Sequence, residues 1–593
     1  MTTKYRNLKI YNIKYFFSYK NKIFYLIIEL MNHITKSIKT FVTDYLILGG
    51  GSAGCVLANR LSENNRHQIT LLEAGKDDKH NWDWWKINMP AALTYNLESK
   101  KYNWGYTTSK QKGLNGRSID APRGKVLGGC SSINAMVYIR GHKLDFDRWA
   151  YSEGANGWSY DECLPYFKKS QKHADINEDI DSRGFDGLLD VKTISNGDYQ
   201  ELFNVFIKAG LEAGYPYINN INNGIQEGFG PLDMTISPNG IRCSTANAFI
   251  RPIINKRNNL KVKCNSHVNR IIFDTKSGSC VKPKAIGVEY FNNKTKNTEI
   301  IYAKKEIISS LGAIGSPTLL QRSGIGDAQF LQSIGCDNII YNNPYVGKNL
   351  QDHTEVYLQY KCNKPITLYP ISKWNYKRIK SGMEWFLNGK GICSSNLFHA
   401  GAFIKSRDNI QHPDIQYHFI PGAVIGQSEF LPIHAFQIHV GTLRPKSKGV
   451  VNIKSLDPSI DPIIDPKYYS ESTDLEDMKI ALKHAVDIVS QPAFKEYKSE
   501  IISPINVGIL ENEIFIENFI RENTHSAYHL SCTCKMGDDQ NGENVVDSKG
   551  KVYGVDNLRI VDSSIFPSMT SGNLNAPTIM LAEKISDEIK KEI

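Results

Sequence analysis

After its first forty residues, the 593-residue sequence lacks any apolar run of the roughly 20 residues needed to span a membrane. It also lacks dense basic blocks interleaved with aromatic residues, because its 71 lysines and arginines are spread among 61 acidic residues. The net charge of +10 therefore does not indicate a nucleic-acid partner, and we expect none. With 41% hydrophobic residues, the composition predicts a soluble globular body, long enough for two to four domains.

The eleven cysteines are an odd number scattered along the chain, which does not suggest the disulfide framework of a small secreted protein. Residues 1–41 stand apart, since they are basic, contain no acid before Glu29 and carry a short apolar run at 23–28. No small-residue cleavage site follows, which argues against a secretory signal peptide. We expect an extension that targets the protein, lies on a membrane surface or is disordered, so the localisation stays undecided.

The first motif present is G-x-G-x-x-G, at Gly49, Gly51 and Gly54. It follows a short apolar run and precedes a helical pattern and a second apolar run ending in Glu73, an order that predicts a βαβ unit. Gly49 allows the tight turn, Gly51 lets backbone approach a pyrophosphate and Gly54 permits close packing of helix on strand. Glu73 lies 19 residues beyond Gly54, where an acid binds a ribose diol and disfavours a 2′-phosphate. The sequence therefore predicts a site for NAD or FAD.

Two further stretches contain glycines that could serve a cofactor. In GKVLGGCSSINAMVYIRG, Gly128 and Gly129 could let backbone pass close to a flat ring system, although such pairs also occur in ordinary turns. GAIGSPTLLQRSGIG follows an apolar run and predicts a strand leading into a helix. We expect Ser316 to cap that helix and Pro317 to be its first residue.

The C-terminal stretch NLRIVDSSIFPSMTSGNLNAPTIM predicts a strand ending in Asp562, a loop and a helix from about Pro577. With MPAAL, YNWGY and VGKNLQDH, these stretches resemble the glucose-methanol-choline (GMC) oxidoreductases, a family of FAD-dependent alcohol-oxidising enzymes. The pattern is most similar to the bacterial choline dehydrogenases and FAD-dependent alcohol oxidases of that family. The resemblance covers about residues 43–589, with Cys130 standing where the family usually has Ser, Thr or Gly.

The resemblance implies a fold of α/β class, α+β overall, made of two interleaved domains. One is a Rossmann-like FAD-binding domain of discontinuous segments, and the other is a substrate domain in which helices back a β-sheet. An alternating pattern at residues 436–466 fits that sheet. The expected segments are 42–160, 225–330 and 540–593 for the FAD-binding domain, and 161–224 and 331–539 for the substrate domain.

The resemblance also implies the residues that hold FAD. The adenosine would lie on the glycine motif and Glu73, and the isoalloxazine near Gly129. Relatives that attach flavin covalently use a histidine at the position of Ile133, and since isoleucine cannot form that bond we expect noncovalent FAD. The predicted FAD-binding residues are Gly49, Gly51, Ser52, Ala53, Gly54, Glu73, Gly128, Gly129, Asn134, Ala135, Val268, Asp562 and Asn575.

The stretch THSAYHLSCTCKMG has the residue types of a metal site. His525 and His529 could share one helical face, and Cys532 with Cys534 could complete a tetrahedron. However, structural zinc sites usually space their cysteines as C-x₂₋₄-C, and a redox pair more often reads C-x-x-C. We therefore predict no metal site and favour cysteines packed in the core.

The same stretch matches the GMC motif H-x-x-x-T-x-x-M at His529, Thr533 and Met536. The match implies that His529 is the catalytic base, a task that suits histidine because its ordinary pKa lies near 6.5. Its partner in the family corresponds to Asn573, which can hydrogen-bond an alkoxide-like oxygen without competing for the proton. Without the resemblance, Asn573 would be interpreted as an ordinary loop residue.

The substrate implied is a small primary alcohol, which becomes an aldehyde. Choline-oxidising relatives carry a Glu that pairs with the ammonium group, and our alignment puts His399 at that position, so we expect an alcohol other than choline. Oxygen or a quinone would accept the electrons, and a homodimer is possible. The alternatives are a choline dehydrogenase, a lyase on the same fold, and a protein that keeps the fold for structural reasons.

Overall fold

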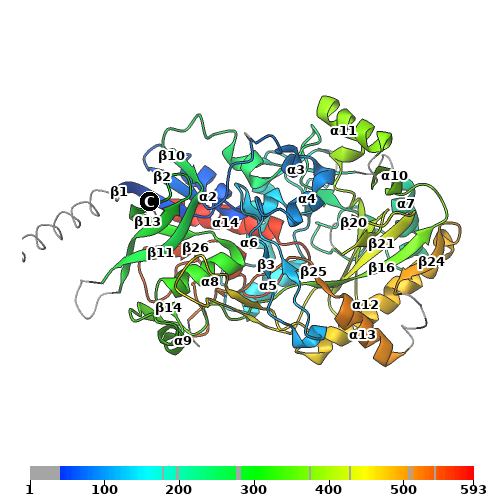
Figure 1. Ribbon diagram of the computed structural model, residues 1–593. Helices are drawn as coiled ribbons and strands as arrows, with labels where there is room; N and C mark the ends of the chain where they lie inside the picture. Colours follow the sequence, from blue (N-terminus) through cyan, green and yellow to red (C-terminus); the bar gives the residue numbers. More distant parts are fainter. Residues whose placement is uncertain are drawn as a thin grey trace, which may run out of the picture.

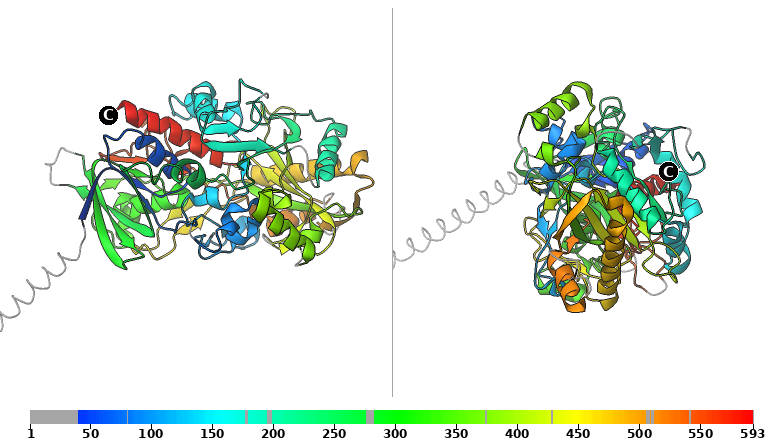
Figure 2. Two further views of the ribbon diagram at one scale, coloured as in Figure 1. Left: turned by 90° about the horizontal axis from the view of Figure 1, so that it is seen from above. Right: turned by 90° about the vertical axis from the view of Figure 1, so that its right-hand side faces the viewer.

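The computed structural model describes residues 40–592 except 80, 177–178, 195–198, 276–281, 373–374, 427–428, 505–507, 509–511 and 540–541. The expected N-terminal extension, 1–41, therefore lies almost wholly outside the described residues. Two large sheets occupy opposite ends of an elongated body, with helices on the outside of each (Figures 1 and 2). The described part of the chain contains no helix with both the length and the apolar character needed to cross a bilayer.

The first sheet contains the predicted βαβ unit. Strand β1 (Thr40–Leu48) lies parallel to β2 (Ile69–Glu73), and helix α2 (Ser52–Leu61) connects them. Consecutive side chains of β1 and β2 are apolar and buried on both faces of the sheet, as is usual for parallel sheets that lie between two layers. The strand order is β10 (Leu260–Cys264), β2, β1, β13 (Asn297–Ser309), β12 (Lys284–Asn292) and β11 (Ser266–Asp274), with β26 (Leu558–Ile560) also on β13. The carboxyl ends of β1, β2, β13 and β26 share one edge, where such sheets bind ligands.

The C-terminal helix α14 (Asn575–Lys591) packs on α2 and on α6 (Tyr160–Ser170) beside this sheet (Figure 2). The guanidinium of Arg60 on α2 donates two hydrogen bonds of 2.8 Å to the buried carboxylate of Glu583 on α14. Because a buried carboxylate needs such a partner, this bidentate pair fixes how the two helices lie against each other.

Helix α8 (Gly312–Arg322) follows β13, but it begins earlier than predicted. Ser316 and Pro317 lie inside the helix, so the expectation that they cap it and begin it is wrong. Pro317 has no N–H to donate to the carbonyl of Ala313, four residues before it. The hydroxyl of Thr533 donates to that oxygen instead, at 2.6 Å, so the carbonyl is satisfied and the helix continues through the proline.

The second sheet is antiparallel and includes chain segments from across the sequence (Figure 1). Helices α7 (Gln200–Glu212), α12 (Ser472–Ser490) and α13 (Glu513–Asn523) share its hydrophobic core. The strand order is β24 (Lys498–Ser503), β16 (Thr354–Cys362), β21 (Ala435–Thr442), β18 (Ile415–Ile420), β17 (Ala400–Ile404) and β8 (Gly228–Pro231), with β25 (His525–Ser526) also on β16.

The three central strands of this sheet alternate strictly between two faces. On β16, Val356, Leu358 and Tyr360 point into the core under the helices, whereas Glu355 and Tyr357 line a cavity on the other face. Strands β18 and β21 alternate in the same way and stay in register with β16. The sheet therefore presents a polar floor on the side that faces the first domain.

The pattern at residues 436–466 is confirmed only for its first strand. β21 lies in the second sheet, whereas β22 (Val450–Asn452) and β23 (Ile463–Asp465) pair with each other in a small sheet. The domain division remains a proposal; since β8 pairs with β17 in the second sheet, we propose that the segment from 225 enters the FAD-binding domain only after Pro231.

Shorter elements join these units. The helices are α3 (Trp85–Asn88), α4 (Thr94–Leu97), α5 (Lys143–Ser152), α9 (Ala328–Ser333), α10 (Tyr369–Ser372) and α11 (Tyr376–Asn388), with single turns η1 (Pro90–Ala92), η2 (Lys112–Leu114), η3 (Gly129–Ser132), η4 (Ala246–Ile250), η5 (Ile392–Ser394), η6 (Pro492–Phe494) and η8 (Ser563–Ile565). The strands are β3 (Tyr106–Thr107), β4 (Asp120–Ala121), β5 (Val137–Tyr138), β6 (Gln171–His173), β7 (Leu189–Thr193), β9 (Asp233–Met234), β14 (Ile325–Gly326), β15 (Tyr341–Asn342), β19 (Val424–Ile425) and β20 (Glu429–Phe430).

Candidate functional site

The predicted glycine motif forms a tight turn at the carboxyl end of β1. Gly49 has a φ of +96°, and a Cβ there would lie 2.5 Å from the carbonyl oxygen of Ser310. A Cβ on Gly54 would lie 1.9 Å from the carbonyl oxygen of Gly49, so α2 can approach the turn this closely only with glycine at that position. The first turn of α2 faces a cavity with Gly51, Ser52 and Ala53. Its free N–H groups form the kind of end that binds a pyrophosphate.

Glu73, at the end of β2, also lines the cavity. Its carboxylate accepts hydrogen bonds from the backbone N–H of Gly50, at 2.8 Å, and of Gly75, at 2.7 Å. Burial raises the pKa of Glu73 to about 7, although the two N–H donors oppose that rise. Each carboxylate oxygen keeps a further lone pair, so the side chain can still accept from a ribose hydroxyl as predicted.

The predicted glycine pair brings a second loop onto the first. A Cβ on Gly129 would lie 2.7 Å from the Cα of Gly51, so only glycine fits between the loops. Gly128 packs against the motif through a 2.6 Å hydrogen bond from its N–H to the oxygen of Gly50, rather than lining the cavity. Asn134 and Ala135 follow the pair and face the cavity.

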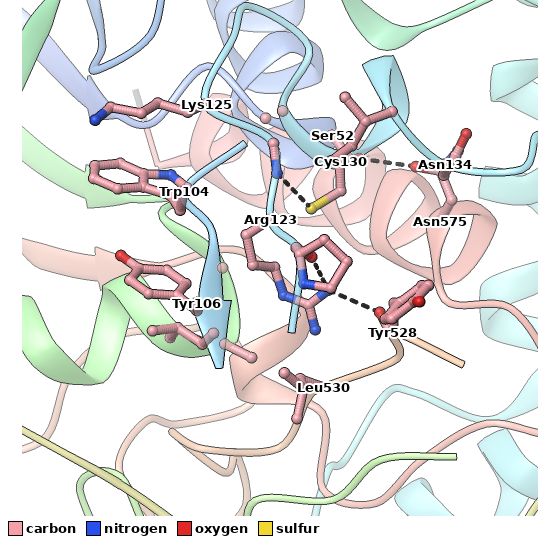
Figure 3. A pocket seen from close by; sticks show the side chains of 18 of the residues that line it. Ser52, Trp104, Tyr106, Arg123, Lys125, Cys130, Asn134, Tyr528, Leu530 and Asn575 are labelled. Atoms are coloured by element: carbon pink, nitrogen blue, oxygen red, sulfur yellow. Dashed lines mark hydrogen bonds between the residues drawn. The ribbon is translucent and has the colours of Figure 1, made fainter. Parts of the chain in front are cut away.

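The remaining predicted FAD-binding residues lie around the same cavity. Val268 lines it from β11. Asp562, which follows β26, accepts hydrogen bonds from the Gly312 N–H at 2.9 Å and the Ser316 hydroxyl at 2.6 Å, and burial raises its pKa. Asn575 begins α14 and accepts a 2.8 Å hydrogen bond from the Ser52 hydroxyl (Figure 3).

The cavity has a volume of about 760 Å³, within the range usual for cofactor sites. Every predicted FAD-binding residue lines it except Gly54 and Gly128, which make the close packing behind it. The indole of Trp104 stacks on the ring of Tyr106 along one wall (Figure 3). A buried acid at one end, a glycine cradle in the middle and polar side chains at the other end fit the extended shape of FAD.

At the far end of the cavity lie His529 and Asn573, from chain segments 44 residues apart. The Nδ2 of Asn573 lies 3.2 Å from the Nε2 of His529. The backbone N–H of His529 donates to the buried carboxylate of Asp352 at 2.8 Å, which holds the loop that carries the ring. The two predicted catalytic residues are therefore adjacent.

A chain of three hydrogen bonds determines which nitrogen of His529 carries the proton. His353 Nε2 lies 2.9 Å from the carbonyl oxygen of Leu443, which can only accept, so this nitrogen carries the proton of His353. A neutral His353 then has a bare Nδ1, which lies 2.9 Å from the Nδ1 of His529. His529 must donate there, so its Nε2 keeps a lone pair facing Asn573 and the cavity.

Burial keeps both rings neutral. It lowers the pKa of His353 to about 4, and it lowers that of His529 well below 6.5, with further contributions from His353, His418 and Arg123. A neutral imidazole with a lone pair aimed into the cavity can accept a proton.

The sequence analysis did not predict a role for Asp352 or His353. Both belong to the stretch VGKNLQDH, directly before β16.

The polar floor of the second sheet supplies cavity residues that the sequence analysis also missed. Glu355 is buried, and its Oε1 accepts from the Tyr357 hydroxyl at 3.0 Å and lies 3.1 Å from the Nδ1 of His439. Burial acts to raise the pKa of Glu355, but His439, the charge of His418 and the Tyr357 hydroxyl outweigh it and hold the pKa below its usual value. The alternation of apolar and polar residues in TEVYLQYKC could have predicted a strand with one polar face, and so the position of Glu355.

His399, predicted to meet the substrate, does not lie on the cavity wall. It is buried beneath the second sheet, where its ring stacks on Phe203 at 4.5 Å and its Nε2 lies 2.5 Å from the Ser395 hydroxyl. Its neighbours Leu397 and Phe398 line the cavity instead. The argument against choline from His399 therefore loses its structural basis.

The metal-like stretch does not form a helix, so His525 and His529 do not share the helical face considered for the metal alternative. His525 lies on β25, where its ring stacks on Tyr357 at 5.0 Å, and His529 follows in a loop. Cys532 and Cys534 are buried in the core of the first domain, and burial raises the pKa of both thiols. Both thiols therefore lie away from the cavity and remain protonated.

Comparison with known proteins agrees with this architecture. The GMC oxidoreductase models of the N- and C-terminal regions match residues 43–355 and 445–582. An oxygen-dependent choline dehydrogenase of Serratia proteamaculans is 44% identical over 92% of this chain and 96% of its own length. The structure of pyridoxine 4-oxidase from Mesorbium loti has a TM-score of 0.80 at 27% identity, covering 92% and 99% of the two chains. An FAD-dependent oxidoreductase from Chaetomium thermophilum has a TM-score of 0.82 at 26% identity, covering 93% and 99%. The chain belongs to the GMC oxidoreductase family and is an FAD-dependent oxidoreductase acting on CH–OH donors.

Proposed function

We propose that this enzyme oxidises a primary alcohol to an aldehyde with His529 as the base. The observation that supports the proposal is the hydrogen-bond chain from the Leu443 carbonyl through His353, which leaves the Nε2 lone pair of His529 in the cavity. A hydroxyl bound beside it meets a proton acceptor in His529 and a hydrogen-bond donor in the Asn573 amide.

Each of these side chains has a separate task. Bound FAD supplies the hydride acceptor that amino-acid side chains lack. His529 removes the hydroxyl proton, which makes the carbinol hydride transferable, and Asn573 stabilises the negative oxygen by donating a hydrogen bond. Asp352 and His353 hold His529 in place without contacting the substrate.

An anaerobic panel of alcohols tests the proposal. An alcohol oxidoreductase bleaches its flavin absorbance when the substrate alcohol is added without air. A lyase or a structural protein on the same fold keeps the oxidised spectrum with every alcohol, and that result would contradict the proposal. Admitting air afterwards tests the acceptor. We propose oxygen, because relatives at 43–44% identity are named oxygen-dependent, and recovery only with an added quinone would indicate the alternative.

We propose that FAD is bound without a covalent link. Ile133 lines the cavity at the position where covalent relatives have histidine, and its side chain offers no nucleophile. Acid precipitation is expected to leave a colourless pellet and a yellow supernatant. A yellow pellet would show that another side chain forms the bond.

We propose that the alcohol carries a positive charge. Glu355 is a carboxylate held ionised on the cavity wall, with Tyr357, Tyr528 and Phe398 also lining that cavity. A carboxylate among aromatic rings is suited to an ammonium group. The Tyr357 hydroxyl and the His439 ring both contact Oε1 of Glu355, so a ligand at Oε2 would displace neither. Choline, the substrate named for the 44% identical relatives, is such an alcohol.

His353→Leu is expected to lower kcat by about 10- to 100-fold while leaving KM for the alcohol nearly unchanged, because it removes the acceptor that orients the His529 proton. His353→Asn is expected to restore most of that loss, since its amide oxygen can occupy the place of Nδ1. Stopped-flow flavin reduction measures both variants. Equal losses in the two would assign His353 a packing role only.

A further inference from the structure

Helix α11 carries an apolar stripe that faces solvent. Tyr376, Ile379, Met383, Phe386 and Leu387 recur at helical spacing along one side, and they are 72, 47, 57, 55 and 75% exposed. Single exposed apolar side chains are common on soluble proteins, but a continuous stripe of five on one helix indicates a binding surface.

The opposite side of α11 accounts for its attachment to the protein. Trp385 is buried, packs with Met89 and Ala92, and its indole N–H donates to the Gly240 oxygen at 2.7 Å. The Asn375 side chain caps the first turn by accepting from the Arg378 N–H at 3.1 Å. Of the stripe, Phe386 also contacts this side, with its ring edge-on to Trp84 at 6.4 Å and to Trp385 at 5.1 Å, although it stays 55% exposed.

The exposed surface extends beyond α11 onto the neighbouring segment. Trp82 is 80% exposed and Tyr95 41% exposed. The Lys86 ammonium lies 5.6 Å from the Trp82 ring and 5.9 Å from the Tyr95 ring, and the Arg378 guanidinium donates to the Tyr95 hydroxyl. Helix α11 protrudes from the body near α3 and α4 (Figure 1).

The charged residues beside the stripe indicate which kind of partner it binds. Residues 376–390 contain Lys377, Arg378, Lys380 and Lys390 but only one acid, Glu384. A two-fold contact between copies would place these like charges against each other. An apolar stripe flanked by basic residues, with aromatic side chains at its edge, is the pattern of helices that lie in the interface of an anionic bilayer.

We propose that α11, with Trp82 and Tyr95, docks the enzyme on the surface of an anionic lipid membrane, with the apolar stripe among the acyl chains and the lysines at the headgroups. The docked surface adjoins the active-site cavity. Met89 and Ala92, which Trp385 contacts, belong to the same segment as Ala91, Leu93, Thr94 and Leu97, which line that cavity.

Co-sedimentation of the full-length, FAD-loaded enzyme with vesicles tests the proposal. We expect binding to phosphatidylcholine vesicles that contain phosphatidylglycerol, weaker binding to phosphatidylcholine alone, and weakening by salt. The double variant Ile379→Glu/Leu387→Glu should lower the vesicle partition at least about tenfold, because two apolar anchors become charged.

The matched control is Ile514→Glu/Phe515→Glu on α13, where side chains 72 and 57% exposed receive the same charges. It should bind vesicles like the wild type, and both variants should keep flavin reduction by alcohol. Vesicle binding that persists in the α11 variant overturns the proposal, since another part such as the basic residues 1–39 then carries it. Absence of vesicle binding, or an α11-dependent dimer without vesicle binding, overturns it as well.

Discussion

Replacing His529 with alanine is expected to slow flavin reduction by the alcohol by at least about 10²-fold, because the variant has no group in position to take the hydroxyl proton. Substrate binding should change much less, since the cavity walls remain. Stopped-flow absorbance under anaerobic conditions measures the rate directly. The wild-type rate should also fall as the pH drops through the pKa of His529, which lies well below 6.5, because protonation removes the Nε2 lone pair.

His525→Gln is the matched control for that experiment. His525 is also mostly buried and lies four residues earlier, but it stacks on Tyr357 and is outside the cavity lining. Its replacement should change the rate severalfold at most. A His529→Ala enzyme that reduces its flavin at the wild-type rate would move the base to another side chain, with His418 of the cavity lining as the first to examine.

Glu355→Gln is expected to lower kcat/KM for choline by about 30- to 100-fold, because a neutral amide no longer pairs with an ammonium group in a buried site. The neutral isostere 3,3-dimethylbutan-1-ol has the same shape without the charge. Its kcat/KM should change by less than about threefold in the same variant. The measurement is the ratio of the two specificity constants in wild type and variant.

Glu299→Gln controls for the loss of a buried carboxylate in general, since Glu299 is buried on β13 of the other sheet and hydrogen-bonds Tyr290 and Asn292. It should leave the ratio unchanged. A wild-type enzyme that prefers the neutral isostere would refute a cationic substrate while leaving alcohol oxidation intact. Equal losses for both alcohols in Glu355→Gln would instead indicate that the residue supports the sheet floor.

The cofactor end of the site could be predicted from sequence because its requirements are local. The positive φ of Gly49 and the close approach of Gly54 to the carbonyl of Gly49 both require glycine, and both arise within one βαβ unit. Asp562 was predicted at a strand end from the apolar run before it, but its place at the cofactor site came from the resemblance to the GMC family, and its bond to α8 only from the structure.

The machinery around the base could not be predicted in this way, because it depends on pairing between distant strands. Leu443 lies 90 residues from His353 in sequence, and His353 lies 176 residues from His529. No local sequence pattern can therefore predict which nitrogen of His529 carries the proton. The start of α8 was misplaced for a similar reason. The donor for the carbonyl that Pro317 leaves unpaired is Thr533, which lies 220 residues from Ala313 in sequence.

The hydrogen bond from Thr533 connects helix α8 to the loop that carries His529. Gly312 and Ala313 of helix α8 line the cofactor cavity. The carbonyl of Ala313 accepts from Thr533, four residues after His529 in the same loop. A shift of the first turn of α8 would move the hydrogen-bond acceptor of Thr533 in that loop. The position of the base loop is therefore coupled, through one hydrogen bond, to the helix turn that lines the cofactor cavity.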